Sequence, residues 1–439
     1  MRILDHYAIE RDLKLAELNN VHRAVELTDE EREIGLRFLR NPAMFDEIVK
    51  DMDALGYVGE DLNKQLLYLC ASSRILDDPI SVMILSQSAS GKSMLVSTVE
   101  KLIPPEDVVS ITSLSDQALN YFASILHKFM NMGEAVHSET IEHQIRDMLS
   151  LHELTRHVVA KDEKTGKMET ETKKTKTIVA LVLTTTRQNI NPENASRFFV
   201  INTDESREQT RRIHEAQRGK YTLDRYLAKL DTIPAIIAKH HAAQRLLRKI
   251  AVVNDFAKLL DFPDTVLRVR RDHERFVDLI ACVCFLRQYQ KVIKNNGRFD
   301  YIECDIEDYR IAYNIMLNGV LASTMFELPK ATTELYATLR TLAAEQAKKK
   351  NLKASEISFT QREIRQLSGY GQSWLRENLR KLVEYEYITV QRGPRRGERG
   401  SYRIKEYSEI EKIDLSMIPT PDMMNILLSS KKQSEQSGH

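Results

Sequence analysis

A short apolar strand that leads into a loop of small residues and then into a helix is the feature that most constrains this chain. The run reads Ile84-Leu-Ser-Gln-Ser-Ala-Ser-Gly-Lys-Ser-Met-Leu-Val96. The backbone N–H groups of such a loop and the positive end of the following helix form a site for phosphate. The usual pattern is G-x-x-x-x-G-K-[ST], and here Ser86 stands where the first glycine is expected. The sequence therefore predicts a nucleotide site with one departure from the pattern.

The residues of this loop have distinct expected roles. Lys92 would reach the β- and γ-phosphates, and the Ser93 hydroxyl would ligate Mg²⁺. The expected cofactors are therefore ATP and Mg²⁺. The residues that we expect to bind the nucleotide are Ser88, Ala89, Ser90, Gly91, Lys92, Ser93 and Met94.

Length and composition are those of an ordinary water-soluble protein. The 439 residues suffice for two or three domains, and 42% of them are hydrophobic and 29% charged. None of the four cysteines (Cys70, Cys282, Cys284 and Cys304) forms a C-x-x-C pair, which argues against a zinc knuckle or a disulfide framework. There is no run of eighteen apolar residues and no export signal at the N-terminus. We expect a cytoplasmic protein without a membrane partner.

Positive charge is concentrated near the C-terminus, although the net charge is only +1. Between Arg340 and Lys405 there are 16 Lys or Arg residues against 7 Asp or Glu residues. Such a basic module indicates contact with a polyanion. The alternative is a solvated helix face.

Strands and helices are expected to alternate behind the loop. Strands are predicted at 108–112, 128–132 and 177–186, and helices at 93–102, 115–126 and 139–154, which together indicate an α/β nucleotide-binding sheet. The expected divisions are a helical N-terminal region (1–78), an ATPase core (79–218), a helical lid (219–345), a C-terminal winged helix (355–406) and a disordered tail (418–439).

Two strand ends supply candidate catalytic groups. A P-loop ATPase needs a carboxylate to orient the attacking water, and Glu134 follows the apolar strand that ends at Met132, with Gly133 where a second acid is usual. Thr186 ends the strand 177–186 and could bond the γ-phosphate or its water, with Thr185 as the close alternative. Otherwise Glu134 would begin a helix and the threonines would form a turn.

Two further segments carry positive charge near the core. Arg197 lies in a polar turn just before an apolar strand, where it could project into a neighbouring subunit's site and neutralise the γ-phosphate. The hairpin between His157 and Thr177 places Lys164 and Lys167 beside a Thr-Gly turn, where they could grip a phosphate backbone. The alternatives are a surface ion pair and a solvated hairpin.

The last module reads as helix, turn, helix and a two-stranded wing, the order of a winged helix. Its second helix is expected to expose three basic residues, and its wing carries Arg392 and three further arginines. These suit contact with a DNA backbone, and the alternative is a protein-docking module. The candidate DNA-binding residues of this module are Arg376, Arg380, Lys381, Arg395, Arg396 and Arg399.

From about 27 to 217 the chain resembles the AAA+ minichromosome-maintenance-like helicases, especially the helicase part of primase-helicase proteins of phages, plasmids and integrated elements. The resemblance includes Leu55-Gly-Tyr-Val-Gly-Glu60, the loop from Ser86 to Ser93, Leu183-Thr-Thr-Thr186 and Glu205-Ser-Arg-Glu-Gln-Thr210. It implies an AAA+ fold in which Lys92, Ser93, Glu134, Thr186 and Arg197 hold the family's catalytic positions and Lys164 and Lys167 its hairpin lysines. It also implies a second-sensor arginine, for which we expect Arg271.

The function that this resemblance implies is an ATP-driven DNA helicase or translocase, acting as a homo-oligomeric ring of six copies in the replication of a mobile element. A separate primase would be a further partner. Two other classes stay open. One is a DNA-binding initiator or loader with a nucleotide switch and little hydrolysis, which Ser86 and Gly133 favour. The other is an AAA+ transcriptional regulator.

Overall fold

The computed structural model describes residues 26–87, 90–111, 125–133, 139–161, 168–186, 192–262, 269–321, 330–368, 370–384, 387–391, 401–405, 415 and 417–436. The chain forms two compact units. Unit 1 comprises Met1–Val320 and Ser416–His439, and unit 2 comprises Leu321–Leu415. Each is described by itself.

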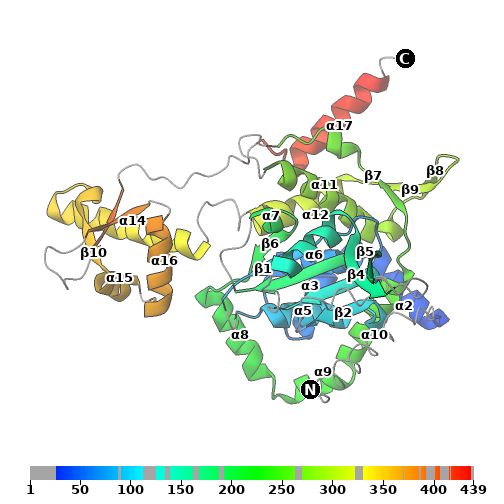
Figure 1. Ribbon diagram of the computed structural model, residues 1–439, viewed down its shortest axis with the longest axis horizontal. Coiled ribbons are helices and arrows are strands. Elements are labelled where there is room, and N and C mark those ends of the chain that lie inside the picture. Colours follow the sequence, from blue (N-terminus) through cyan, green and yellow to red (C-terminus); the bar gives the residue numbers. More distant parts are fainter. Residues whose placement is uncertain are drawn as a thin grey trace. The chain divides into compact units, whose positions relative to one another are not determined.

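A central parallel sheet organises unit 1 (Figure 1). Its strand order is β2-β3-β5-β1-β6, and every pairing along this path is parallel. β4 pairs antiparallel with β5 and extends the sheet into a two-stranded ribbon. The strands are β1 (Val82–Leu85), β2 (Val108–Ile111), β3 (Ile125–Met132), β4 (Glu153–Lys161), β5 (Met168–Thr185) and β6 (Phe199–Asn202).

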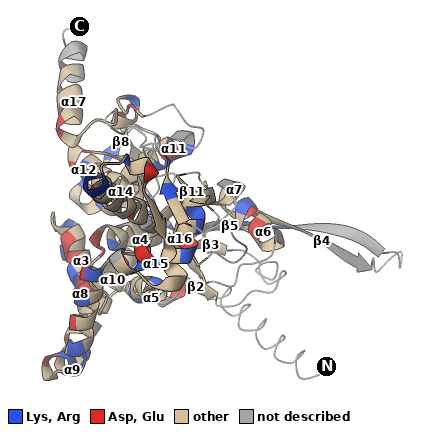
Figure 2. Cartoon of the chain, turned by 90° about the vertical axis from the view of Figure 1, so that its left-hand side faces the viewer, with Lys and Arg blue, Asp and Glu red and all other residues tan. Residues whose placement is uncertain are grey.

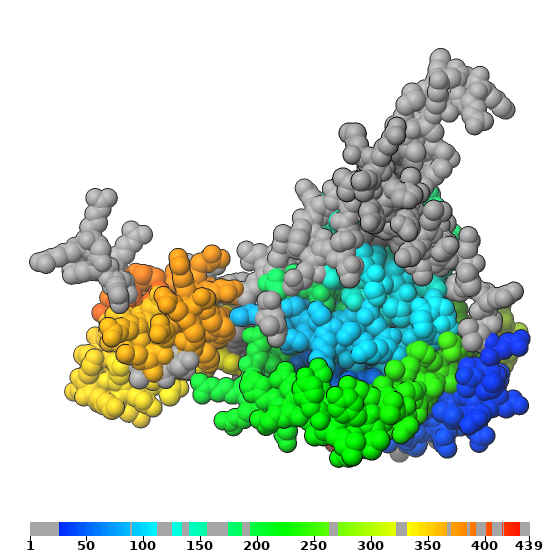
Figure 3. Space-filling model, turned by 90° about the horizontal axis from the view of Figure 1, so that it is seen from below, coloured from blue at the N-terminus to red at the C-terminus, as the bar shows by residue number. Residues whose placement is uncertain are grey.

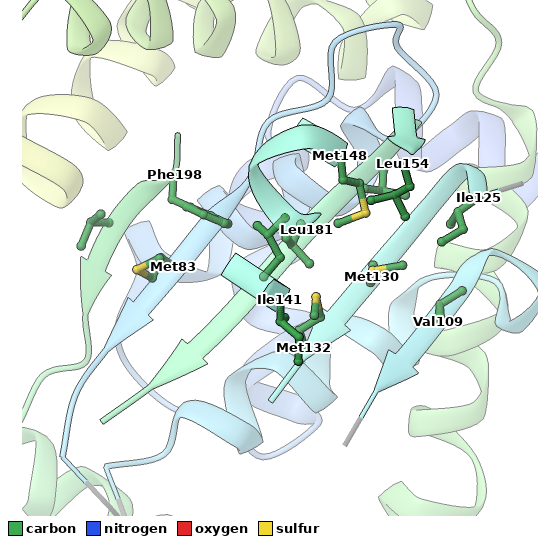
Figure 4. Packing of buried hydrophobic residues seen from close by; sticks show 13 residues of the cluster. Met83, Val109, Ile125, Met130, Met132, Ile141, Met148, Leu154, Leu181 and Phe198 are labelled. Atoms are coloured by element: carbon green, nitrogen blue, oxygen red, sulfur yellow. The ribbon is translucent and has the colours of Figure 1, made fainter. Parts of the chain in front are cut away.

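The core of this sheet lies under α6 (Glu139–Ser150), as Figure 4 shows. Met83, Met130, Leu181 and Phe198 come from four neighbouring strands or their approaches, and they pack with Met148 of the helix. Continuous apolar runs of this kind are typical of parallel strands that are covered on both faces. The prediction of an α/β sheet behind the loop is confirmed, and its central strands are parallel.

Further helices belong to the sheet domain, and α5 lies where a helix was predicted at 93–102. α2 begins with a capping box at Thr28 and Glu31, and Gly56 and Gly59 separate α3 from α4 in backbone with positive φ. These elements are α2 (Asp29–Arg40), α3 (Met44–Ala54), α4 (Asp61–Ser73), α5 (Lys92–Leu102), η1 (Pro105–Asp107) and α7 (Pro192–Ala195).

The rest of unit 1 is mainly helical, but it also contains a small sheet that the sequence did not predict. Its strands are β7 (Ala251–Val253), β8 (Lys294–Asn295) and β9 (Asp300–Glu303), in the order β7-β9-β8. The helical elements are α8 (Arg207–Gly219), α9 (Leu223–Leu230), α10 (Thr232–Leu246), η3 (Asp255–Lys258), α11 (Val269–Leu286), η4 (Gln288–Gln290), α12 (Ile306–Asn314), η5 (Ile315–Leu321) and α17 (Pro421–Gln436).

Unit 2 has its own core and a three-stranded antiparallel sheet in the order β10-β12-β11. Leu335 and Leu339 of α14 pack there with Leu375, Leu379 and Phe359. The elements are α14 (Lys330–Lys350), η6 (Ala354–Glu356), β10 (Ser358–Thr360), α15 (Gln361–Ser368), α16 (Gln372–Glu384), β11 (Ile388–Gln391) and β12 (Ser401–Ile404).

Besides the small sheet, the fold differs from the sequence-based expectations in four places. α6 ends at Ser150 because β4 begins at Glu153, and β3 already begins at Ile125, where a helix was predicted to end. The tail predicted to be disordered forms α17, whose Met424 is fully buried. The boundary between the units follows Val320, whereas the expected lid extended to residue 345. Residues 112–124, where most of the predicted helix 115–126 falls, lie outside the described residues.

Among the described helices, none is both long and apolar enough to cross a lipid bilayer.

Candidate functional site

The phosphate-loop candidate lies at the carboxyl end of the parallel sheet. β1 ends at Leu85, which pairs with Thr185 on one side and with Asn202 on the other. α5 begins at Lys92, and Gly91 before it has a φ of 95°, a backbone conformation that favours glycine. Loops at this end of a parallel sheet, next to a helix N-terminus, are the usual place for a phosphate ligand.

Ser86, the departure from the usual pattern, ties the loop to the strand beside it. Its hydroxyl oxygen accepts a 2.8 Å hydrogen bond from the backbone N–H of Thr203, and it lies 2.7 Å from the Thr203 hydroxyl. It also donates to the carbonyl of Leu85. A glycine would offer none of these contacts, so the serine connects β1 to the residue that follows β6.

Lys92 is folded into the loop that precedes it. Its ammonium donates to the carbonyl oxygens of Ser86 at 2.7 Å and Gln87 at 2.6 Å. The residue is buried, with a relative exposure of 5%. The positive charge is therefore fixed at the centre of the loop.

Three other loop residues are described. The hydroxyl oxygen of Ser90 is buried and has no hydrogen-bond partner among the described residues. Ser93 and Met94 are exposed at the start of α5. Ser88 and Ala89 lie outside the described residues. A buried hydroxyl without a partner costs free energy, which an oxygen-rich ligand in the loop would relieve.

Thr186 comes directly after β5, beside the loop. The backbone N–H of Ser86 donates to the carbonyl of Thr185 at 3.4 Å, and Thr186 is exposed. Glu134 lies outside the described residues, but Gly133 before it follows β3, the strand on the other side of β5. The backbone N–H of Gly133 donates to Ile111 at 3.2 Å, so β2 and β3 also end together.

The sequence did not predict a second group of residues that borders the loop. The side chain of Tyr57 lies 3.7 Å from where a β-carbon on Gly91 would stand, and its hydroxyl donates to Glu60 at 2.8 Å. Burial raises the pKa of Glu60. Gln209 of α8 donates to the carbonyl of Val58 at 2.6 Å. Gly56 and Gly59 indicate a turn at this segment in the sequence. No local sequence pattern, however, connects this turn with Gln209.

Arg197 lies at the opposite end of the sheet. β6 starts at Phe199, which pairs with Val82 at the start of β1, and Arg197 precedes that pair. Its Nε donates to the Ser150 hydroxyl at 2.7 Å, at the end of α6. The whole length of β1, ~15 Å with its flanking residues, separates this guanidinium from the phosphate loop of the same chain.

Arg275 of α11 holds the turn that carries Arg197. Its guanidinium donates to the carbonyl of Ser196 and, at 3.3 Å, to that of Ala195, and it pairs with Asp272 at 2.7 Å. Arg275 and Asp272 are both buried. Arg271, the expected second-sensor residue, is one turn earlier on α11 and is exposed. α11 therefore brings Arg271 to the end of the sheet where Arg197 lies.

The expected DNA-binding residues are only partly described. Arg376 and Arg380 are exposed on α16. Lys381, expected to be exposed with them, is 92% buried at a relative exposure of 8%, and its ammonium lies 3.6 Å from Glu377. The residues outside the described part of the chain are Lys164, Lys167, Arg395, Arg396 and Arg399.

One group of described residues has the composition of a metal site, at Cys284, Cys304 and Asp308. The Asp308 carboxylate, however, already lies 2.5 Å from both the Arg287 guanidinium and the Lys291 ammonium. Two positive side chains at the same carboxylate oppose the binding of a cation.

A match to a family model agrees with the sheet and its loop. Residues 29–239 match the family model described as the MTBMA_p00010 P-loop domain. A search of the curated proteins found no match. Among solved structures, a full-length MCM homolog from Methanopyrus kandleri is similar at 11% sequence identity and a TM-score of 0.44, over 67% of this chain and 62% of that chain. This chain thus spans less than two thirds of that protein. The family model, the parallel sheet and the loop between β1 and α5 together identify a P-loop domain in unit 1.

Proposed function

We propose that this chain is an ATP-driven DNA helicase or translocase that works as a ring of six copies. The observation that carries the proposal is the separation of the phosphate loop from Arg197 by the length of β1. A P-loop ATPase needs a positive charge at the γ-phosphate for fast hydrolysis. Since Arg197 lies at the far end of its own sheet, it suits the phosphate loop of a neighbouring copy.

The described residues of the loop fit ATP with Mg²⁺. Lys92 would hold the β- and γ-phosphates, the exposed Ser93 hydroxyl would ligate the metal, and Ser90 would gain a partner for its buried oxygen. Bound MgATP supplies the phosphoanhydride whose hydrolysis would drive movement along DNA. Thr186 would hold the attacking water beside the loop, and Glu134 would accept its proton.

Three further parts of the proposal rest on sequence. Lys164 and Lys167 would grip DNA in the ring's pore, and Arg271 would bind the nucleotide as a second-sensor arginine. A role in replicating a mobile element, alongside a separate primase, rests on the resemblance from 27 to 217.

The proposal is tested by ATP hydrolysis and strand displacement with forked, single-stranded and random duplex DNA. We expect hydrolysis that single-stranded DNA stimulates, and unwinding of the fork. Strong preference for one duplex sequence would instead indicate a regulator, and nucleotide-dependent assembly without turnover would indicate an initiator or loader.

For unit 2 we propose a winged helix that binds the DNA backbone. The order α14, β10, α15, α16, β11, β12 with an antiparallel sheet supports it, as do the exposed Arg376 and Arg380.

We expect Arg376→Ala with Arg380→Ala to weaken binding to all duplex sequences alike and to flatten the slope of log affinity against log salt by about two. Lys348→Ala, at an exposed position in the last turn of α14, is the control. Fluorescence anisotropy at several salt concentrations measures both quantities. An unchanged slope would remove α16 from the DNA interface.

Arg275 is proposed as a positioning residue, because it holds the carbonyls on the turn before Arg197. We expect Arg275→Met to lower kcat for ATP about 10- to 100-fold, since a small displacement of a catalytic group costs that much, with ATP affinity unchanged. Mixing this variant with Lys92→Ala chains, whose Arg197 is intact, should restore turnover. Arg275→Lys keeps the charge and should lose less. A loss of ATP affinity in step with kcat would point to a merely structural role.

A further inference from the structure

α9 carries an apolar face that the described part of the chain leaves uncovered. Leu223, Tyr226, Leu227 and Leu230 follow the i, i+3, i+4, i+7 spacing of one helix face, and none of the residues of α9 is buried. With Tyr221 in the preceding turn, these side chains are between 49% and 75% exposed. Exposed apolar stripes of this kind usually mark an interaction surface.

The helix that carries this stripe lies beside the phosphate loop. Arg225 of α9 donates to the carbonyl of Ala54, and it would lie 3.1 Å from a β-carbon on Gly56. Met94, two residues after Lys92 and 49% exposed, would lie 3.6 Å from the same β-carbon. Figure 3 views the molecule from the side on which α9 lies, where α8, α9 and α10 form a green band. We call residues 207–231 the α8–α9 arm.

The arm is also basic. From Arg207 to Asp231 there are seven Lys or Arg residues and four Asp or Glu residues. Figure 2 shows both signs of charge along the two helices. Lys220 and Lys229 lie over the rings of Tyr221 and Tyr226, at 5.8 Å and 5.1 Å from the ring centroids. A complementary surface would combine apolar and acidic groups.

Such a surface exists at the opposite end of the sheet, and we call it the Arg197 face. Leu151, 68% exposed, follows Ser150, to which Arg197 is bonded. The next residue, His152, lies 2.9 Å from Asp78, which lines a pocket of about 650 Å³. Asp78 comes shortly before β1, so the pocket and Arg197 share the amino end of the sheet.

The pocket on this face is predominantly acidic. Four aspartates line it against two basic residues, of which Lys249 is paired with Asp77. Asp278 belongs to α11, one turn after Arg275, so the same helix holds the Arg197 turn and lines the pocket. The charged residues that line the pocket are Asp77, Asp78, Asp278, Asp300, Arg248 and Lys249.

We infer that the α8–α9 arm of one copy docks on the Arg197 face of the next copy. The two surfaces are complementary in charge, each includes exposed apolar side chains, and they lie at opposite ends of one sheet. A contact between two different faces is head-to-tail and can close into a ring. The contact also brings the phosphate loop, which lies beside the arm of its own copy, close to Arg197 of the neighbouring copy. The inference rests on the proposed ring and names the surfaces that hold it together.

Two variants test the two surfaces in the full-length chain. The arm variant carries Leu223→Ser and Leu230→Ser, and the face variant carries Asp278→Lys. Val292→Ser, at an exposed apolar residue outside both surfaces, and Glu307→Lys, at a half-exposed acid, are the matched controls. Assembly is followed by sedimentation velocity with Mg²⁺ and a non-hydrolysable ATP analogue, and thermal unfolding confirms that each variant is folded.

We expect both test variants to be mainly monomeric at concentrations about tenfold above those at which the wild type and the controls assemble. Their mixture should give heterodimers and nothing larger, because the intact arm of the face variant fits the intact face of the arm variant. Unchanged assembly of either test variant overturns the inference. So does a mixture that stays monomeric, because it would mean that an intact arm does not bind an intact Arg197 face.

Failure of the motor proposal would look different. If the wild type assembles through these surfaces but never hydrolyses ATP, the docking inference is supported and the motor proposal is wrong. If the wild type hydrolyses ATP with DNA while both test variants assemble normally, the motor proposal is supported and the docking inference is wrong.

Discussion

Lys92→Ala is expected to lower DNA-stimulated ATP hydrolysis by about 10³-fold or more, because it removes the charge that would stabilise the transferred γ-phosphoryl group. The side chain is buried in the loop and is held by the carbonyls of Ser86 and Gln87. Alanine leaves those two carbonyls without their donor, and the loop is expected to bind ATP more weakly as well. Phosphate release and the affinity for a fluorescent ATP analogue measure the two effects.

Lys101→Ala is the matched control, since Lys101 is an exposed lysine in the last turn of the same helix. Its hydrolysis should equal that of the wild type. Hydrolysis that survives in Lys92→Ala would contradict a motor built on this loop. If the wild type binds ATP and assembles without turnover, and Lys92→Ala loses that assembly, the chain is a nucleotide-switched initiator or loader.

The loop and the strands beside it were predictable because their signals are local. An apolar run followed by Gly91, Lys92 and Ser93 specifies strand, loop and helix within a dozen residues, and the structure has β1 and α5 there. The uninterrupted apolar run 178–183 likewise predicted a buried central strand, and β5 lies between β3 and β1.

What depends on distant contacts was not predictable. Gln209 donates to the carbonyl of Val58, which is 151 positions away in the chain, and no pattern in either segment predicts this contact. Lys381 looked like an exposed DNA contact because it stands beside Arg380 in the sequence, but the turn of the helix places it at the core, near Glu377. The strands β7, β8 and β9 are two to four residues long, too short for an alternating pattern.

The tail was misjudged for a related reason. Its last residues are polar and suggested disorder, yet Met424 is fully buried and the Tyr309 hydroxyl donates to the carbonyl of Pro419 at 2.6 Å. The buried side chains of Ile418 and Met424 and one buried hydrogen bond attach the start of this segment to unit 1, and composition alone does not reveal these contacts.

Arg197→Ala is expected to reduce hydrolysis about 10³-fold in the assembled protein while ATP binding stays as in the wild type. Folding should suffer little, since the variant loses a partly exposed bond to the Ser150 hydroxyl, a loss of about 1 kcal/mol. Arg37→Ala, at an exposed arginine in the last turn of α2, should behave as the wild type.

Mixing Arg197→Ala with Lys92→Ala chains separates action on a neighbour from action within one chain. Neither variant should hydrolyse ATP alone, but an intact loop next to an intact arginine arises wherever the two alternate in the right order. With equal amounts and independent sites, about a quarter of the wild-type rate should return, one half for an intact loop times one half for an intact neighbouring arginine. β1 lies between Arg197 and the phosphate loop of its own chain, so Arg197 can act only on the loop of a neighbouring copy. A mixture that assembles but stays inactive would exclude this action on the neighbour, on which the ring mechanism depends.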